Sequence, residues 1–183
     1  MPRTVAVLVG SLRDGSFSRK TARAIEKLAP DLAFRFVEIG DLAFYNQDLE
    51  TAAPPPAWTR FREAVHGADA VLFVTPEYNR GLPAVVKNAL DVGSRPYGHS
   101  VFDGKPAAVV SVSPGAIAGF GANHQLRQSL VFLNMPVLQQ PEAYVGAAHT
   151  LFDDAGALTN KDTEAFLAKF AQAFTAWIAK IAP

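Results

Sequence analysis

Apolar residues follow two different rhythms along this chain. Residues 70–75 and 107–112 form nearly continuous apolar runs, which are typical of strands buried on both faces of a parallel sheet. Residues 4–9 form a similar run, whereas residues 33–39 alternate between apolar and polar side chains, as a half-buried strand does. We also expect a fifth strand to begin at 136–138.

Between these strands the apolar residues recur every three or four positions, which predicts helices. The helices are expected at 16–29, around 58–68, around 82–90, around 126–133 and at 163–181. The last helix carries large residues along one side, and we expect them to pack in the core: Phe166, Phe170, Phe174, Trp177 and Ile181.

Strands that alternate with helices predict an α/β fold, a doubly wound five-stranded parallel sheet with helices on both faces. No repeat or composition shift divides the chain, so residues 1–183 are expected to form a single domain. Ligands of such sheets bind outside the carboxyl ends of the strands. The loops after Val9, Thr75 and Val112 are therefore expected to meet at one edge.

Composition and charge exclude several classes of function. The 17 basic and 17 acidic residues balance, which argues against a nucleic-acid partner. Because cysteine is absent, disulfides, thiolate metal sites, iron–sulfur clusters and a cysteine nucleophile are excluded. The four histidines are scattered, so no metal site is expected. With no signal-peptide pattern and no apolar stretch long enough for a membrane, a cytoplasmic protein is expected.

The loop after the first strand has the composition of an anion site. Gly10 and Gly15 allow close approach of the backbone, and Arg13 can donate a charge-assisted hydrogen bond. Ser16 and Ser18 add hydroxyls where the free amides of a helix begin. The loop matches neither the P-loop nor the dinucleotide fingerprint, which favours a mononucleotide, with flavin mononucleotide (FMN) as the leading candidate. The alternative for Ser16 is a simple helix cap.

The loop at 76–83 also follows a buried strand. Pro76 fixes its backbone, and Tyr78 can flank a planar ring. Free backbone groups there can pair with the polar edge of a heterocycle. The alternative is an ordinary strand-to-helix turn in which Asn79 makes a local hydrogen bond.

A third loop, at 113–121, contains three glycines and a proline, which suggests close approach of the backbone to a ligand. Ser113 stands at the tip of the strand, and we expect it to reach the bound group. Plain flexibility of the loop is the alternative.

Together these segments resemble the NADPH-dependent FMN reductase family, which includes quinone and chromate reductases. The resemblance spans about residues 4–140 and implies a flavodoxin-like fold, one FMN per subunit, and homodimers that often pair into homotetramers. The motifs that carry it are Gly10-Ser11-Leu12-Arg13-Asp14-Gly15-Ser16, Pro76-Glu77-Tyr78-Asn79, Lys87-Asn88-Ala89-Leu90-Asp91 and, more loosely, 113–121 with Leu126-Arg127.

The resemblance also implies which residues bind the cofactor. The phosphate would be held by Ser11, Arg13, Ser16, Phe17 and Ser18. The isoalloxazine ring would be lined by Pro76, Glu77, Tyr78 and Asn79, with Ser113 and Gly115 nearby. Three positions depart from the family pattern: Ser18 in place of a frequent Asn, Val92-Gly93 in place of a Trp, and Phe120 between Gly119 and Gly121.

We therefore expect a two-electron oxidoreductase. NADPH or NADH would give hydride to flavin N5, and a quinone, free flavin or a similar acceptor, chromate included, would be reduced in turn. The flavin carries this chemistry, so no catalytic side chain is expected. Donor and acceptor would share one slot, which predicts ping-pong kinetics.

Two alternatives remain open. The first is a flavodoxin-type one-electron carrier without NAD(P)H turnover, although such carriers are usually strongly acidic and this chain is balanced. The second is a binding or regulatory module that holds a phosphate ligand without turnover.

Overall fold

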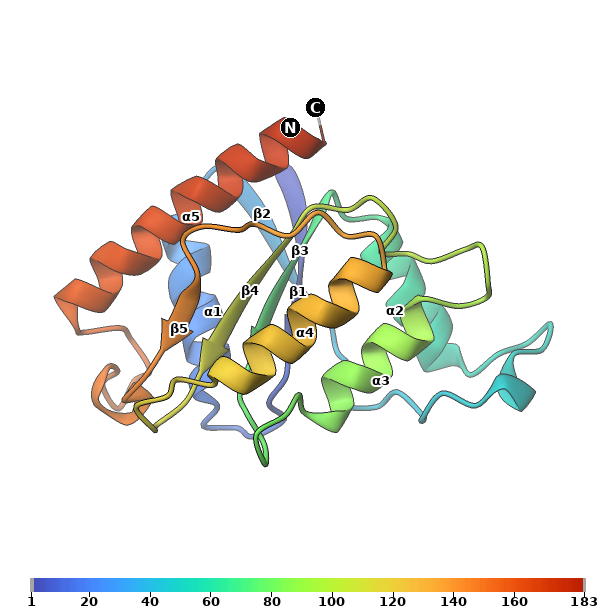
Figure 1. Cartoon of the computed structure of the whole chain (residues 1–183), viewed down its shortest axis with the longest axis horizontal. Coiled ribbons are helices and arrows are strands. Elements are labelled where there is room, and N and C mark those ends of the chain that lie inside the picture. Colours follow the sequence, from blue (N-terminus) through green and yellow to red (C-terminus); the bar gives the residue numbers. More distant parts are fainter. Residues whose placement is uncertain (1, 183) are drawn as a thin grey trace.

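The computed structural model describes residues 2–182, in which five strands alternate with five helices (Figure 1). The strands are β1 (Arg3–Val9), β2 (Leu32–Phe36), β3 (Ala70–Thr75), β4 (Ala107–Val112) and β5 (Ala143–Val145). The helices are α1 (Phe17–Leu28), α2 (Pro56–His66), α3 (Ala84–Gly93), α4 (Phe120–Phe132) and α5 (Lys161–Ile181). Two short 3-10 turns lie at Gln47–Leu49 and Ala148–Thr150. None of these helices has both the length and the apolar character needed to cross a membrane.

All neighbouring strands pair in parallel, in the order β2-β1-β3-β4-β5. The chain starts near the centre of the sheet, builds outward to β2, and then returns past β1 to build the other half. This is the strand order of flavodoxin-like folds, and the crevice at the reversal point lies between the carboxyl ends of β1 and β3. The predicted fold class is confirmed.

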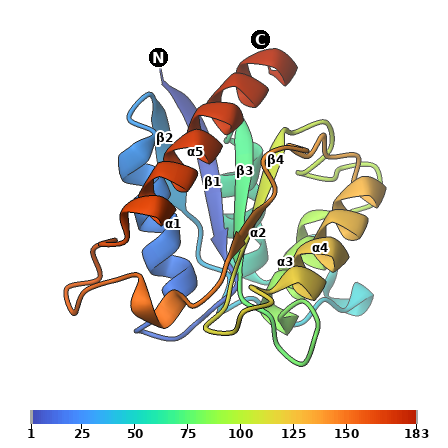
Figure 2. The ribbon, with the colours of Figure 1, turned by 60° about the vertical axis from the view of Figure 1, so that its left-hand side comes forward.

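The sheet separates two cores. Successive residues of a strand point to opposite faces, so Val5 and Val7 enter one core while Ala6 and Leu8 enter the other. Helices α1 and α5 cover the first face, and α2, α3 and α4 cover the second (Figure 2). This arrangement explains why the central strands are apolar along their whole length.

Four of the five residues of the stripe predicted on the last helix pack as expected, whereas Ile181, in the last turn, is only half-buried and lies outside that core. Phe170 and Phe174 are fully buried, and Phe166 and Trp177 are partly buried against the same core. Helix α5 begins two residues before the predicted start, because the side chain of Asn160 accepts a hydrogen bond from the Thr163 amide and caps the first turn.

The prediction for the fifth strand was wrong in position. Residues 136–138 contribute only an isolated bridge, in which Val137 lies beside Ala107, and β5 itself forms at Ala143–Val145. Six residue steps separate Val137 from Ala143, whereas only three separate their partners on β4. The intervening segment contains Pro141, which has no N–H to donate to a ladder. Regular pairing therefore begins only after it.

Candidate functional site

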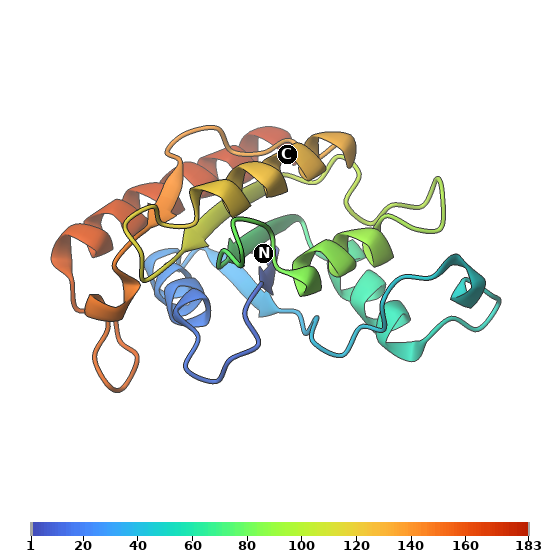
Figure 3. The same cartoon turned by 60° about the horizontal axis from the view of Figure 1, so that its bottom comes forward.

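The three loops singled out by the sequence meet at the carboxyl edge of the sheet, which Figure 3 views with residues 10–16 in blue, 76–83 in green and 113–119 in yellow. Gly10 packs so closely on the second loop that a methyl group there would lie 3.1 Å from Cδ of Pro76. Gly119 of the third loop lies within ordinary contact distance of the second loop, since a methyl group there would lie 3.6 Å from Cβ of Glu77. The expected convergence of the loops is confirmed.

Ser16 is the helix cap that the sequence allowed as an alternative. Its Oγ accepts a hydrogen bond of 3.1 Å from the Arg19 amide, and the residue is only 2% exposed. A hydroxyl that accepts in this way still has its own hydrogen to donate. The cap and an anion contact are therefore compatible.

The same loop presents donors that the protein leaves unused. Ser11 and Ser18 are 5% and 2% exposed, and neither hydroxyl has a hydrogen-bond partner among residues 2–182. Arg13 is exposed and makes no ion pair within those residues. The first two amides of α1, those of Phe17 and Ser18, also lack partners there. These hydroxyls, amides and guanidinium are the chemistry that a phosphate dianion requires, so the loop fits the phosphate of FMN.

The ring of Phe17 points away from that donor set. It stacks on Phe152 with the ring centroids 6.3 Å apart, and it is partly buried against the core of α1 and α5. Only the backbone of Phe17 is free to meet an anion at this loop.

The second loop is a tight hairpin turn. Tyr78 and Gly81 exchange two backbone hydrogen bonds of 3.0 and 2.9 Å, and both central residues, Asn79 and Arg80, have positive φ (52° and 66°). This is the geometry of a type I′ turn. The alternative with a local Asn79 side-chain bond is not what forms. The turn leaves Tyr78 47% exposed at the edge of the site.

The side chain of Glu77 binds helix α4 and does not face a ligand ring. Its carboxylate accepts a hydrogen bond of 2.9 Å from the Ala122 amide in the first turn of α4, and its side chain is 9% exposed. Gln125 on α4 makes the reciprocal link, because its Oε1 accepts from the Leu82 amide at 2.6 Å. The two bonds fix the second loop to the helix that follows the third. Only the backbone of Glu77 remains to line a ring.

The third loop is held by a chain of polar contacts. Ala118 has a positive φ of 57°, and its carbonyl accepts a hydrogen bond of 2.7 Å from the buried hydroxyl of Ser111. Asn123 donates to that hydroxyl at 3.4 Å and accepts at 2.9 Å from Arg127. Sequence analysis missed Ser111 and Asn123 because buried polar residues carry no local pattern.

Ser113 turns back on its own loop. Its Oγ accepts a hydrogen bond of 3.1 Å from the Gly115 amide. Its backbone is also engaged, donating to the Val145 carbonyl and accepting from the Ala148 amide. The hydroxyl hydrogen of Ser113 therefore remains as the group that it can offer to a ligand.

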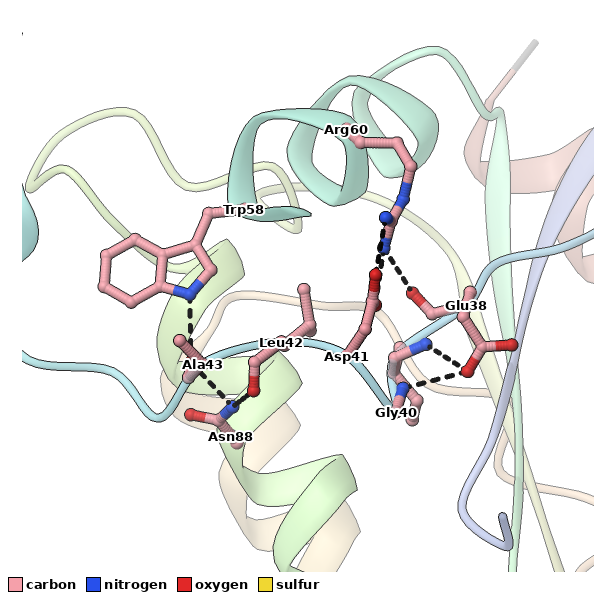
Figure 4. Close-up of polar contacts among 9 residues, drawn as sticks. Glu38, Gly40, Asp41, Leu42, Ala43, Trp58, Arg60 and Asn88 are labelled. Atoms are coloured by element: carbon pink, nitrogen blue, oxygen red, sulfur yellow. Dashed lines mark hydrogen bonds and ion pairs between the residues drawn. The ribbon is translucent and has the colours of Figure 1, made fainter. Parts of the chain in front are cut away.

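The segment after β2 borders the first loop and is fixed by side chains of α2 and α3 (Figure 4). Asn88, from the 87–91 motif, is 6% exposed. Its Oδ1 accepts from the Tyr45 amide at 2.8 Å, and its Nδ2 donates to the carbonyls of Leu42 and Ala43, each at 3.1 Å. The sequence pointed to the 87–91 motif but did not show the role of Asn88. In the structure Asn88 anchors the segment that follows β2.

The start of that segment is held by hydrogen bonds to the carboxylates of Glu38 and Asp41. Glu38 Oε1 accepts from the Gly40 amide at 2.9 Å, and β2 ends at Phe36, three residues before the predicted end. Arg60 of α2 binds Asp41 through two hydrogen bonds of 2.8 Å, and these bonds lower the pKa of the Asp41 carboxyl. Among residues 2–182, no three His, Asp or Glu side chains gather where a metal ion could be held.

Comparison with known proteins agrees with this geometry. The family model of NADPH-dependent FMN reductase matches residues 3–150. A quinone reductase of Pseudomonas putida is 62% identical over 176 residues, which cover 96% of this chain and 94% of that protein.

Two solved structures place the fold. The flavoenzyme NAD(P)H:(acceptor) oxidoreductase FerB of Paracoccus denitrificans is 41% identical and superposes with a TM-score of 0.92 over 98% of both chains. A flavodoxin of Pseudomonas aeruginosa has a TM-score of 0.57 over 94% of this chain and 99% of its own, at 22% identity, which supports the fold alone. This chain, with its flavodoxin-like sheet and its three converging loops, belongs to the NADPH-dependent FMN reductase family.

Proposed function

We propose that this protein is an NAD(P)H-dependent quinone reductase that binds FMN at the three loops. The observation that carries the proposal is the unused donor set of the first loop, which packs through Gly10 against Pro76 of the loop that carries the exposed Tyr78. Membership of the reductase family supports the same conclusion.

In this proposal the FMN phosphate is held at the N-terminus of α1. Arg13 supplies the charge, and the hydroxyls of Ser11, Ser16 and Ser18 and the amide of Phe17 supply further donors. Ser16 donates to the phosphate while it accepts from the Arg19 amide. The same residue, Ser16, therefore caps the first turn of α1 and contributes to the proposed phosphate site.

The isoalloxazine ring is proposed to lie on the second and third loops. In this proposal Pro76, Tyr78 and Asn79 offer apolar surface and backbone groups to the ring, and Ser113 and Gly115 of the third loop contact it as well. The hydrogen bonds of Glu77 and Gln125 fix the second loop relative to α4, which follows directly after the third loop. When bound, FMN supplies the chemistry of taking two electrons with hydride from NADPH or NADH and delivering them to a quinone, free flavin or a similar acceptor such as chromate.

A spectrum and a kinetic pattern test this function. We expect the purified protein to show the visible absorption of oxidised FMN, which NADPH bleaches without oxygen. Initial-velocity lines at several quinone concentrations should be parallel, because donor and acceptor use one slot in turn. A yellow protein that does not oxidise NAD(P)H with any quinone would instead support one of the two alternatives, the flavodoxin-type carrier or the module without turnover.

We further propose that the protein is a homodimer joined through the face of α3 and α4. A groove of about 490 Å³ runs between these helices, bordered by Leu90 and Leu133. Phe132 lines this groove and is 89% exposed. A second hollow shares Lys87 and Asp91 of α3 with the groove, and it is lined by Phe44, which is 75% exposed. Exposed aromatic side chains beside a groove are typical of a protein interface, and the chain's zero net charge does not oppose self-association.

A further inference from the structure

Arg80 occupies a backbone position that is unfavourable for arginine. It is the second central residue of the type I′ turn, with φ of 66°, where glycine is strongly preferred. Asn79 suits the first position, but glycine comes one residue late, at Gly81. Strain of this kind persists where the surrounding structure imposes it, and it concentrates at ligand sites.

The guanidinium of Arg80 has almost no partner in the protein. Its side chain is 75% exposed, and its one contact is 3.4 Å long, to Oε1 of Glu77. The other oxygen of that carboxylate is engaged with the Ala122 amide. A long, exposed pair of this kind contributes little to stability, so the fold does not account for Arg80.

The position of Arg80 suggests what it meets. The turn that carries it also carries Tyr78, at the edge proposed for the flavin ring, while Arg13 stands on the separate loop proposed for the FMN phosphate. The quinone has no phosphate, whereas the pyridine nucleotide brings a pyrophosphate and, in NADPH, a 2′-phosphate as well. A planar guanidinium matches phosphate oxygens with two parallel hydrogen bonds.

We propose that Arg80 binds a phosphate group of the NAD(P)H donor and so determines the enzyme's affinity for that substrate. This inference rests on the proposed function. The turn presents the guanidinium to the nucleotide as its ring approaches the flavin. The shared chemistry is a phosphate ester, and the pyrophosphate and the 2′-phosphate are its two possible sources.

The test compares Arg80→Gly with Arg35→Ala, which removes another exposed arginine, on β2. Glycine suits the turn, so Arg80→Gly should fold and retain FMN. We expect its KM for the donor to rise about tenfold at low salt, since one exposed charge-assisted contact is lost. The kcat/KM for the quinone should not change, and Arg80→Lys should lose less than Arg80→Gly.

Direct binding gives a second readout. Calorimetric titration of the FMN-loaded protein uses ADP, which carries the pyrophosphate, and adenosine 2′,5′-bisphosphate, which carries the 2′-phosphate. Arg80→Gly should bind at least one of these two probes more weakly than the wild type does. A loss for both NADH and NADPH supports pyrophosphate recognition, and a loss for NADPH alone supports the 2′-phosphate. Donor constants and nucleotide binding equal to those of the wild type would overturn the inference, as would an equal loss in Arg35→Ala. If the wild type itself does not oxidise NAD(P)H, the proposed function fails instead.

Discussion

Replacing Arg13 and Ser16 by alanine, singly and together, separates anchoring of the cofactor from capping of the helix. The side chain of Arg13 has no partner among residues 2–182, so Arg13→Ala should leave the free energy of unfolding of the FMN-free protein unchanged. Ser16 caps α1 through the Arg19 amide, so Ser16→Ala should lower that free energy by about 1 kcal/mol. Both changes should weaken FMN binding.

The size of the binding loss follows from the contacts. An exposed charge-assisted bond from Arg13 contributes about 1.5 kcal/mol, and a neutral bond from the Ser16 hydroxyl contributes about 1 kcal/mol. The double variant should therefore lose about 2.5 kcal/mol, which corresponds to roughly 60-fold in Kd.

Quenching of FMN fluorescence on titration with the FMN-free protein measures the Kd, and urea unfolding measures stability. Arg35→Ala is the matched control, because it removes an exposed arginine from β2 and should bind FMN like the wild type. High salt should reduce the difference between Arg13→Ala and the wild type, because the lost term is a Coulombic one. An unchanged Kd for Arg13→Ala at low salt would place the anchor elsewhere and refute the reasoning.

Three further predictions test other parts of the structure. Phe132→Glu puts a charge on the exposed aromatic side chain of α4, so sedimentation should detect a monomer where the wild type is a dimer; a dimeric variant would remove this face from the interface. Asn88→Ala leaves the Tyr45 amide and two carbonyls without their partner, so urea unfolding should detect a loss of about 2 kcal/mol, and a loss below 0.5 kcal/mol would contradict the anchoring role. The Thr4 amide donates a hydrogen bond to Asp69, and this bond is the main cause that lowers the pKa of the Asp69 carboxyl below its ordinary 3.8. The ionised carboxyl therefore stabilises the folded protein above pH 3.8, and this contribution is lost as the pH falls below that value. Asp69→Asn should therefore be less stable than the wild type at neutral pH and converge with it in acid, and parallel curves would count against this assignment.

The local patterns of the sequence carried most of the fold. Apolar runs such as 70–75 fix a buried strand, and the 3.6-residue spacing of Phe17, Thr21, Ile25 and Leu28 fixes the inner face of α1. Parallel strands joined by helices leave their following loops at one edge, so the meeting of the three loops could be predicted as well. The position of β5 could not be predicted, because a strand of three residues beside a proline-containing segment shows too little periodicity.

By itself, then, the sequence determined the class of the sheet, the edge that carries the candidate site and the loops that converge there, since each depends on neighbours within a few residues. The tertiary structure decided where individual polar groups are used. Glu77 meets an amide 45 residues away, and Asn88 meets one 43 residues away. Such bonds exist only because two distant segments pack side by side, and no spacing within either segment encodes the partner. Buried polar groups must nonetheless find partners, and the fold supplies them.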